Sequence, residues 1–116
     1  MAKAPRPWTV QPHRPLKKLE ENLWILEGKL PKGPMYRRMS IVKRADGSLL
    51  FYQAVPMDDA TLSEIRAWGK PSILIVPHDQ HGIDAMPFAE KLGLKIYGPK
   101  RNEAKLRQKI ELAGLV

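Results

Sequence analysis

Residues 73–84 decide the fold, and they read Ile-Leu-Ile-Val-Pro-His-Asp-Gln-His-Gly-Ile-Asp. Four branched apolar residues stop at a proline, and two histidines, two aspartates and a glutamine follow within seven residues. An apolar run this short is typical of a strand buried on both faces of a sheet. Ligands of open α/β sheets collect beyond the carboxyl ends of such strands. The sequence therefore predicts a candidate site at His78–Asp84.

The residues before this strand predict a helix within Pro56–Gly69. Asp58 or Asp59 is placed to cap its first turn. Its apolar positions recur at three-residue spacing: Leu62, Ile65 and Trp68. Gly69 ends the helix and Pro71 prevents its return. Because a strand–helix–strand connection normally forms a right-handed crossover, we expect parallel pairing here.

Further upstream, the pattern predicts an antiparallel meander of three strands. The first strand contains Leu23–Leu26, and the second is Met35–Arg44, in which apolar residues alternate loosely with polar ones. Residues 45–48 read Ala-Asp-Gly-Ser, a strong hairpin signal because Asp-Gly readily adopts positive φ angles. Leu49–Val55 then returns as an apolar strand.

Downstream of the histidine loop, we expect a short helix at Ala85–Leu92, a strand at Leu94–Tyr97 and a final helix at Asn102–Ala113. The final helix would share one apolar face among Leu106, Ile110 and Ala113. The predicted fold class is α/β (α+β), a mixed sheet with helices on one face.

Composition indicates one domain in the reducing cytoplasm. The chain has 116 residues and no cysteine, which excludes disulfides and thiolate chemistry. No apolar run approaches the ~20 residues that span a bilayer, and the N-terminus lacks a signal peptide's apolar segment. We expect a basic, proline-rich arm over residues 1–18, with Trp8 and Val10 available to dock it, and a single domain over residues 19–116.

The net charge of +8 makes nucleic acid or another anion a candidate partner. Two segments concentrate the charge, residues 29–44 and residues 95–109, with six basic residues each. Against this, no known nucleic-acid-binding motif is visible, and the aromatic residues mostly fall in positions typical of a core.

Metal binding is the most specific chemical function that the residues of this loop suggest. His78 and His81, with Asp79 and Asp84, are ligand types for zinc or iron. A catalytic zinc usually takes three protein ligands, and the remaining histidine, His13, lies in the arm. A histidine–aspartate pair is also suited to acid–base chemistry without metal, and the same residues can simply cap the next helix.

The order of elements resembles the N-terminal half of a metallo-β-lactamase-fold domain, closest to its degenerate, uncharacterised members. The resemblance covers roughly residues 19–100. It rests on short words in a shared order: Asn-Leu-Trp followed by Glu-Gly (residues 22–28), Asp-Gly-Ser-Leu (residues 46–49) and Val-Pro followed by histidine (residues 76–81). The resemblance implies half of an αββα sandwich, in which two sheets pack face to face with helices outside.

The chain departs from the family's metal loop, His-x-His-x-Asp-His. His78 falls at the first histidine and Gln80 at the second, whereas His81 and Gly82 match the last histidine and its glycine two residues too early. The family's further ligands come from its C-terminal half, and its hydrolysis depends on a metal-activated water. The resemblance therefore implies ancestry more strongly than activity.

Half of such a sandwich leaves one apolar sheet face bare, which is rare on soluble monomers. We expect a homodimer packed sheet to sheet, or a separate chain that completes the sandwich. Three functions stay open: a non-catalytic, self-associating module without a cofactor; a metal-dependent, hydrolase-like domain using His78–His81; and a basic nucleic-acid- or anion-binding protein. The first ranks highest because the ligand set is incomplete.

Overall fold

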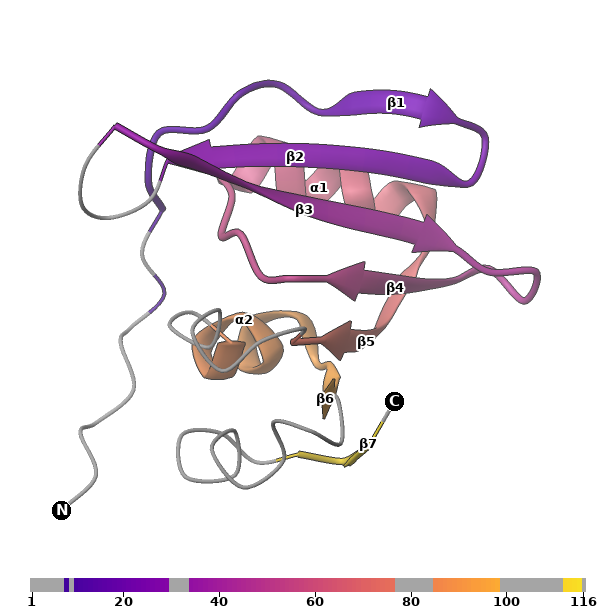
Figure 1. The fold of residues 1–116 in the computed structure, drawn as a ribbon. Helices are drawn as coiled ribbons and strands as arrows, with labels where there is room; N and C mark the ends of the chain where they lie inside the picture. Colours follow the sequence, from indigo (N-terminus) through magenta and orange to yellow (C-terminus); the bar gives the residue numbers. More distant parts are fainter. Residues whose placement is uncertain (1–7, 9, 30–33, 77–84, 99–111, 116) are drawn as a thin grey trace, which may run out of the picture.

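The computed structural model describes residues 8, 10–29, 34–76, 85–98 and 112–115, which form a seven-stranded mixed sheet with two helices (Figure 1). In chain order the elements are β1 (Lys17–Glu20), β2 (Leu23–Lys29), β3 (Tyr36–Lys43), β4 (Ser48–Tyr52), α1 (Asp59–Trp68), β5 (Lys70–Ile75), α2 (Ala85–Leu92), β6 (Lys95–Gly98) and β7 (Gly114–Leu115). The strands lie in the sheet in this same order. The predicted fold class, a mixed α/β sheet with helices on one face, is confirmed.

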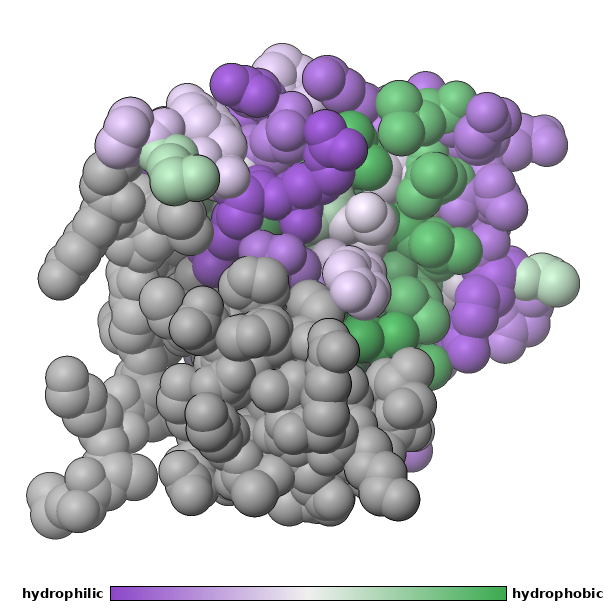
Figure 2. All heavy atoms as spheres, in the orientation of Figure 1, coloured by the Kyte–Doolittle hydropathy of each residue, from purple (hydrophilic) through white to green (hydrophobic). Residues whose placement is uncertain are grey.

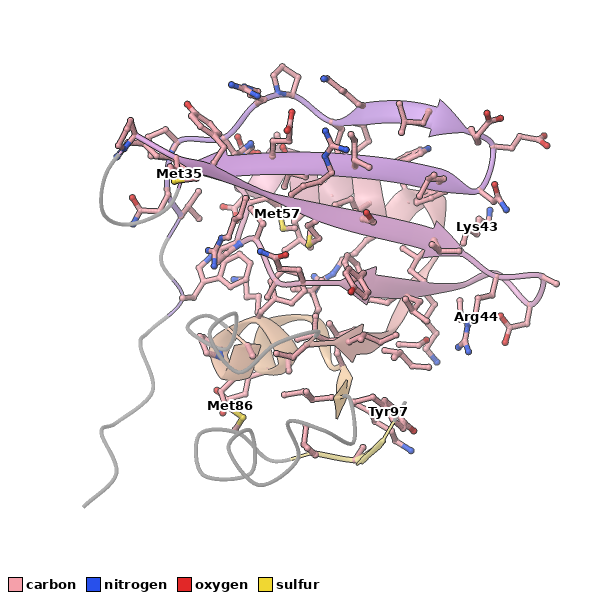
Figure 3. The ribbon with its side chains drawn as sticks, viewed as in Figure 1. Met35, Lys43, Arg44, Met57, Met86 and Tyr97 are labelled. Atoms are coloured by element: carbon pink, nitrogen blue, oxygen red, sulfur yellow. The ribbon has the colours of Figure 1, made fainter. Side chains whose placement is uncertain are left out.

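Pairing changes direction at β4. Strands β1 to β4 pair antiparallel, which confirms the predicted meander, and β4 to β7 pair parallel. The β3–β4 turn has Gly47 at φ +86°, and the Asp46 carboxylate accepts from the backbone N–H of Ser48 at 2.9 Å. Arg44 lies beside this hairpin and donates to the Ser48 hydroxyl at 2.8 Å (Figure 3). The side chains that close the turn are therefore all local.

Helix α1 begins where the sequence predicts. The Asp58 carboxylate accepts from the backbone N–H of Thr61 at 2.8 Å, and Gly69 donates its N–H to Ile65 at the other end. Gly69 sits in extended backbone with φ −170°, so it ends the helix without a left-handed turn. Helix α2 matches its predicted bounds.

One core fills the space between the sheet and the helices, with α1 behind the sheet in Figure 1. Alternate strand residues supply its sheet side: Trp24, Leu26, Met39, Ile41, Leu49, Phe51, Leu74 and Ile96. The helices supply Leu62, Ile65, Phe88 and Leu92, and Met57 is fully buried behind β3 (Figure 3). Trp24 of β2 stacks on Trp68 of α1 with ring centroids 3.9 Å apart, which joins the two layers.

Part of the N-terminal arm packs on this body. Trp8 stacks against Phe88 of α2 with centroids 5.9 Å apart, as predicted, whereas Val10 is 41% exposed. His13 has its ring Nε2 positioned to accept from the backbone N–H of Asp58 at 3.1 Å. The arm therefore runs from α2 to the start of α1 before it joins the sheet edge as β1.

Four expectations are wrong in detail. The strand Ile73–Val76 is not buried on both faces. Helices cover one face, whereas Ile73 and Ile75 on the other face are only half-buried. Strand β4 ends at Tyr52 instead of Val55, because Gln53 turns the backbone to φ +73°. Strands β1 and β7 were not predicted, and Leu112 and Ala113 are not helical. Residues 102–111 of the predicted last helix lie outside the described residues.

Among the described residues, every helix is too short or too polar to cross a bilayer.

Candidate functional site

The predicted metal residues lie outside the part of the chain that the structure describes. This applies to His78, Asp79, His81 and Asp84 alike. The described chain reaches Val76, whose backbone N–H donates to the Tyr97 carbonyl at 2.9 Å, and resumes at Ala85, the first residue of α2. Within the described ranges, no three His, Asp or Glu side chains are grouped to hold a metal. A zinc or iron site at His78–Asp84 stays a prediction.

Gln53 is an unusual residue at the edge from which that loop departs. It is buried at 9% exposure, it has φ +73°, and its backbone N–H donates to the Ile75 carbonyl at 2.9 Å. Positive φ is uncommon for a residue with a side chain and costs energy that the surroundings must repay. Sequence reasoning missed it because glutamine carries no turn signal.

A second candidate site is the sheet face opposite the helices. Two rows of neighbouring side chains cross it, since alternate residues of a strand share a face. Cross-strand partners define the first row as Leu23, Val42, Leu50, Ile73 and Lys95, and the second row as Ile25, Ser40, Tyr52, Ile75 and Tyr97. We call its six aliphatic members the apolar panel: Leu23, Ile25, Val42, Leu50, Ile73 and Ile75.

The apolar panel lies outside the core cluster that packs against the helices. Ile25 is buried at 4% exposure, although it is not a member of that cluster. The other five panel residues are half-buried. Figure 2 shows a band of hydrophobic residues on this face, next to a hydrophilic patch. The sequence carried part of the signal for this panel, because residues two positions apart in a strand share a face. Which strands lie side by side, and therefore which of these residues meet, came only from the structure.

Tyrosines complete this face. All three tyrosines of the chain fall on it by register, whereas the tryptophans of β2 and α1 and both phenylalanines pack on the helix side. Tyr52 is 46% exposed, and the Tyr97 ring lies over Gly114, where an added Cβ would be 2.8 Å from the ring. Tyrosine suits a half-wet surface because its ring is apolar and its hydroxyl is polar. The tyrosines are therefore the exceptions to the expectation that the aromatic residues mostly fall in core-like positions.

One end of the same face carries charge. The Glu27 carboxylate lies 3.1 Å from Arg14, 3.4 Å from Arg38 and 3.7 Å from Lys17. The pKa of Glu27 is lowered, chiefly by the hydrogen bond from Arg14, and the charges of Arg14, Arg38 and Lys17 overcome the opposing effect of burial. The three cations remain more than half exposed. This end of the face therefore has a net positive charge, because the single carboxylate of Glu27 balances only one of the three cations.

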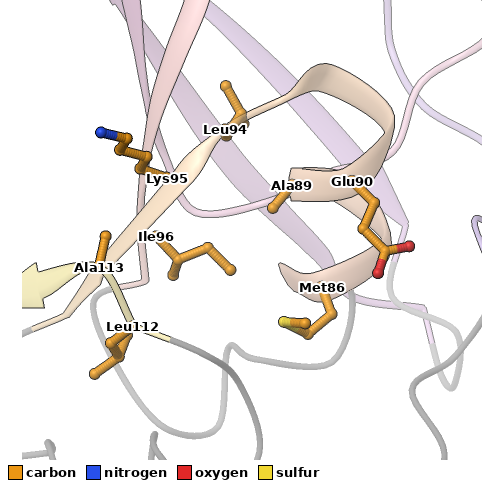
Figure 4. Close-up of a pocket in the computed structure, with 8 residues that line it drawn as sticks. All are labelled: Met86, Ala89, Glu90, Leu94, Lys95, Ile96, Leu112 and Ala113. Carbon is orange, nitrogen blue, oxygen red and sulfur yellow. The ribbon is translucent and has the colours of Figure 1, made fainter.

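A separate pocket of about 330 Å³ lies between α2, β6 and the residues before β7 (Figure 4). Its walls are Met86, Ala89, Glu90, Leu94, Lys95, Ile96, Leu112 and Ala113. Aliphatic walls of this kind receive apolar groups. Glu90 and Lys95 are the charged members, and they provide no nucleophile paired with a base.

No protein-family model matches the sequence, and no curated protein matches it. The resemblance to the metallo-β-lactamase fold therefore stays a prediction.

Proposed function

We propose that this protein is a non-catalytic interaction module that self-associates by packing the apolar panel of one copy against that of a second copy. One observation carries the proposal: six aliphatic side chains from four adjacent strands lie together on the face opposite the helices. Two twisted sheets pack well face to face at about 10 Å, as in β-sandwiches. An identical patch on each copy gives a closed twofold dimer.

The size of the face supports a second copy as its occupant. Five strands about 4.8 Å apart, each contributing roughly five residues at about 3.3 Å, give a projected area of roughly 400 Å². The largest apolar patch of a monomer is typically about 300–600 Å² and is often functional. A standard interface buries about 800 Å² on each partner. The projected area of this face is about half that value, which corresponds to a small interface and to a reversible dimer.

The resemblance to the metallo-β-lactamase fold supports the same arrangement, because that fold packs a second sheet where this chain exposes its apolar panel. Loss of a metal ligand at Gln80 is consistent with a non-catalytic role.

Sedimentation velocity across a micromolar dilution series tests the proposal. We expect a reversible dimer in the wild-type protein and a monomer when Leu50→Gln and Tyr52→Ser are combined, because both side chains occupy the centre of the face. Val10→Gln is the control, since Val10 lies in the arm and is 41% exposed, close to the 46% of Tyr52. It should dimerise normally.

Circular dichroism and thermal unfolding must show that the double variant remains folded. A wild-type monomer at every concentration would refute self-association. A dimer that the double variant leaves intact would place the interface elsewhere and refute the assignment of the panel.

A further inference from the structure

A cluster of positive charge adjoins the apolar panel without overlapping it. We call it the cationic corner and define it by Arg14, Lys17, Lys29, Arg38 and Tyr36, which surround Glu27. Register places them together: Glu27 faces Arg38, and Lys29 faces Tyr36 on the neighbouring strand. Arg14 reaches the group from the arm, held by its backbone N–H bond to the Glu27 carbonyl at 2.8 Å.

Charge in the cationic corner is unbalanced. Glu27 is the carboxylate that these cations contact among the described residues, and it meets three of them at 3.1–3.7 Å. The side chains of Arg14, Lys17 and Arg38 are 53%, 56% and 59% exposed, so their charged groups remain open to a solvent-borne anion. Four cations against one carboxylate give a surface that attracts polyanions.

The cationic corner also offers a stacking surface. The Arg14 guanidinium lies 4.3 Å from the centroid of the Tyr36 ring, and Tyr36 is 39% exposed. Nucleic-acid bases stack on aromatic rings and on guanidinium planes, and this recognition targets unpaired strands. An acidic peptide needs the cations and gains little from the stacked ring. Cations and ring together therefore favour nucleic acid.

We propose that the cationic corner binds single-stranded nucleic acid, with phosphates on the guanidinium and ammonium groups and a base stacked on the Arg14–Tyr36 pair. The cationic corner and the six-residue apolar panel share no residue, so variants of the panel leave the corner's own side chains in place. We expect this binding to have no base-sequence specificity, since the cationic corner offers only charge and one aromatic ring. Affinity should fall with salt with a log–log slope of about −3 if four phosphates are contacted.

Fluorescence anisotropy with a labelled oligothymidylate, at low salt, tests the proposal. Lys17→Gln with Arg38→Gln should weaken binding by roughly tenfold or more, because two phosphate contacts are lost. Tyr36→Leu keeps the charge and should weaken binding by roughly tenfold through lost stacking. Lys70→Gln with Lys91→Gln removes the same charge from exposed positions elsewhere and should change affinity little. Thermal unfolding confirms that each variant is folded.

Three results would overturn this proposal. They are no binding by wild type at low salt, equal loss in the corner and control variants, and competition by polyglutamate as strong as by unlabelled oligothymidylate. The last result would assign an acidic protein as the partner. The Leu50→Gln, Tyr52→Ser variant should still bind the oligonucleotide, so failure of self-association and failure of nucleic-acid binding are distinguishable.

Discussion

Single side chains fix the start of α1. The Asp58 carboxylate caps the helix through the backbone N–H of Thr61. The pKa of Asp58 is lowered, chiefly by its side-chain hydrogen bond with Thr61 and then by this backbone hydrogen bond, against the opposing effect of desolvation. Asp58 also donates its backbone N–H to His13, so the cap anchors the arm as well. One residue thus joins local helix formation to tertiary packing.

We expect Asp58→Ala to lower the free energy of unfolding by about 1 kcal/mol near neutral pH, as for other N-caps. The pKa of Asp58 in the folded protein is below the ordinary aspartate value of about 3.9. The contribution of Asp58 to the free energy of unfolding is therefore fully present above that value and is lost as pH falls through the folded pKa. Urea unfolding at neutral and at acid pH measures it. Asp59→Ala is the neighbouring control and should cost much less, and equal costs would contradict the assignment.

The histidine loop allows a second prediction at this scale. We expect elemental analysis to find no stoichiometric zinc or iron in the purified protein, because Gln80 replaces one histidine of the resembled motif. Tight metal that disappears in His78→Ala would contradict the non-catalytic proposal. Metal retained by His78→Ala would place the site at other residues.

At the scale of elements, the close approach of two segments explains why position 28 is a glycine. A Cβ on Gly28 of β2 would lie 2.5 Å from Cγ1 of Val55, in the segment that links β4 to α1. Val55 is 2% exposed and has little room to shift. The path of that segment across the sheet therefore requires glycine at position 28.

Gly28→Ala should destabilise the protein by about 1–3 kcal/mol through overpacking. Val55→Ala removes the clashing methyl, so the double variant should lose less than the sum of the two single losses. A thermodynamic cycle from urea unfolding measures the coupling. Strict additivity would show that the two residues do not meet.

The sheet edge shows a further device at this scale. Edge strand β1 is exposed along its whole length and carries Lys17 and Lys18, with Pro12 and Pro15 just before it. Lysine and proline on an edge discourage pairing with another chain. This protection favours association through the face of the sheet over association through its β1 edge.

For the whole molecule, the two proposed surfaces respond oppositely to salt. Two copies that each carry +8 repel one another, so screening should strengthen the dimer. Nucleic-acid binding should weaken under the same change, because counterion release loses its advantage. Sedimentation and anisotropy in one salt series measure both. A dimer that weakens with salt would indicate a charged interface instead of an apolar one.

Local signals made much of the fold predictable. The Asp-Gly turn, the Asp58 cap and the Ala85–Leu92 helix depend on neighbours within a few residues, and all three are confirmed. Gln53 was not predictable, since its positive φ is imposed by packing around β4 and β5 and not by its own preference. Of the candidate site, His78, Asp79, His81 and Asp84 came from sequence alone and lie outside the described residues.

The sequence by itself determined the element types and the meander, because periodicity and turn chemistry act over short stretches. Tertiary structure decided which sheet face the two described helices cover, and that all three tyrosines lie on the other face. It also brought Arg14, Glu27 and Arg38 together from the arm, β2 and β3. Strand register governs both outcomes, because a shift of one residue would move every side chain of a strand to the other face. No short stretch encodes that register alone.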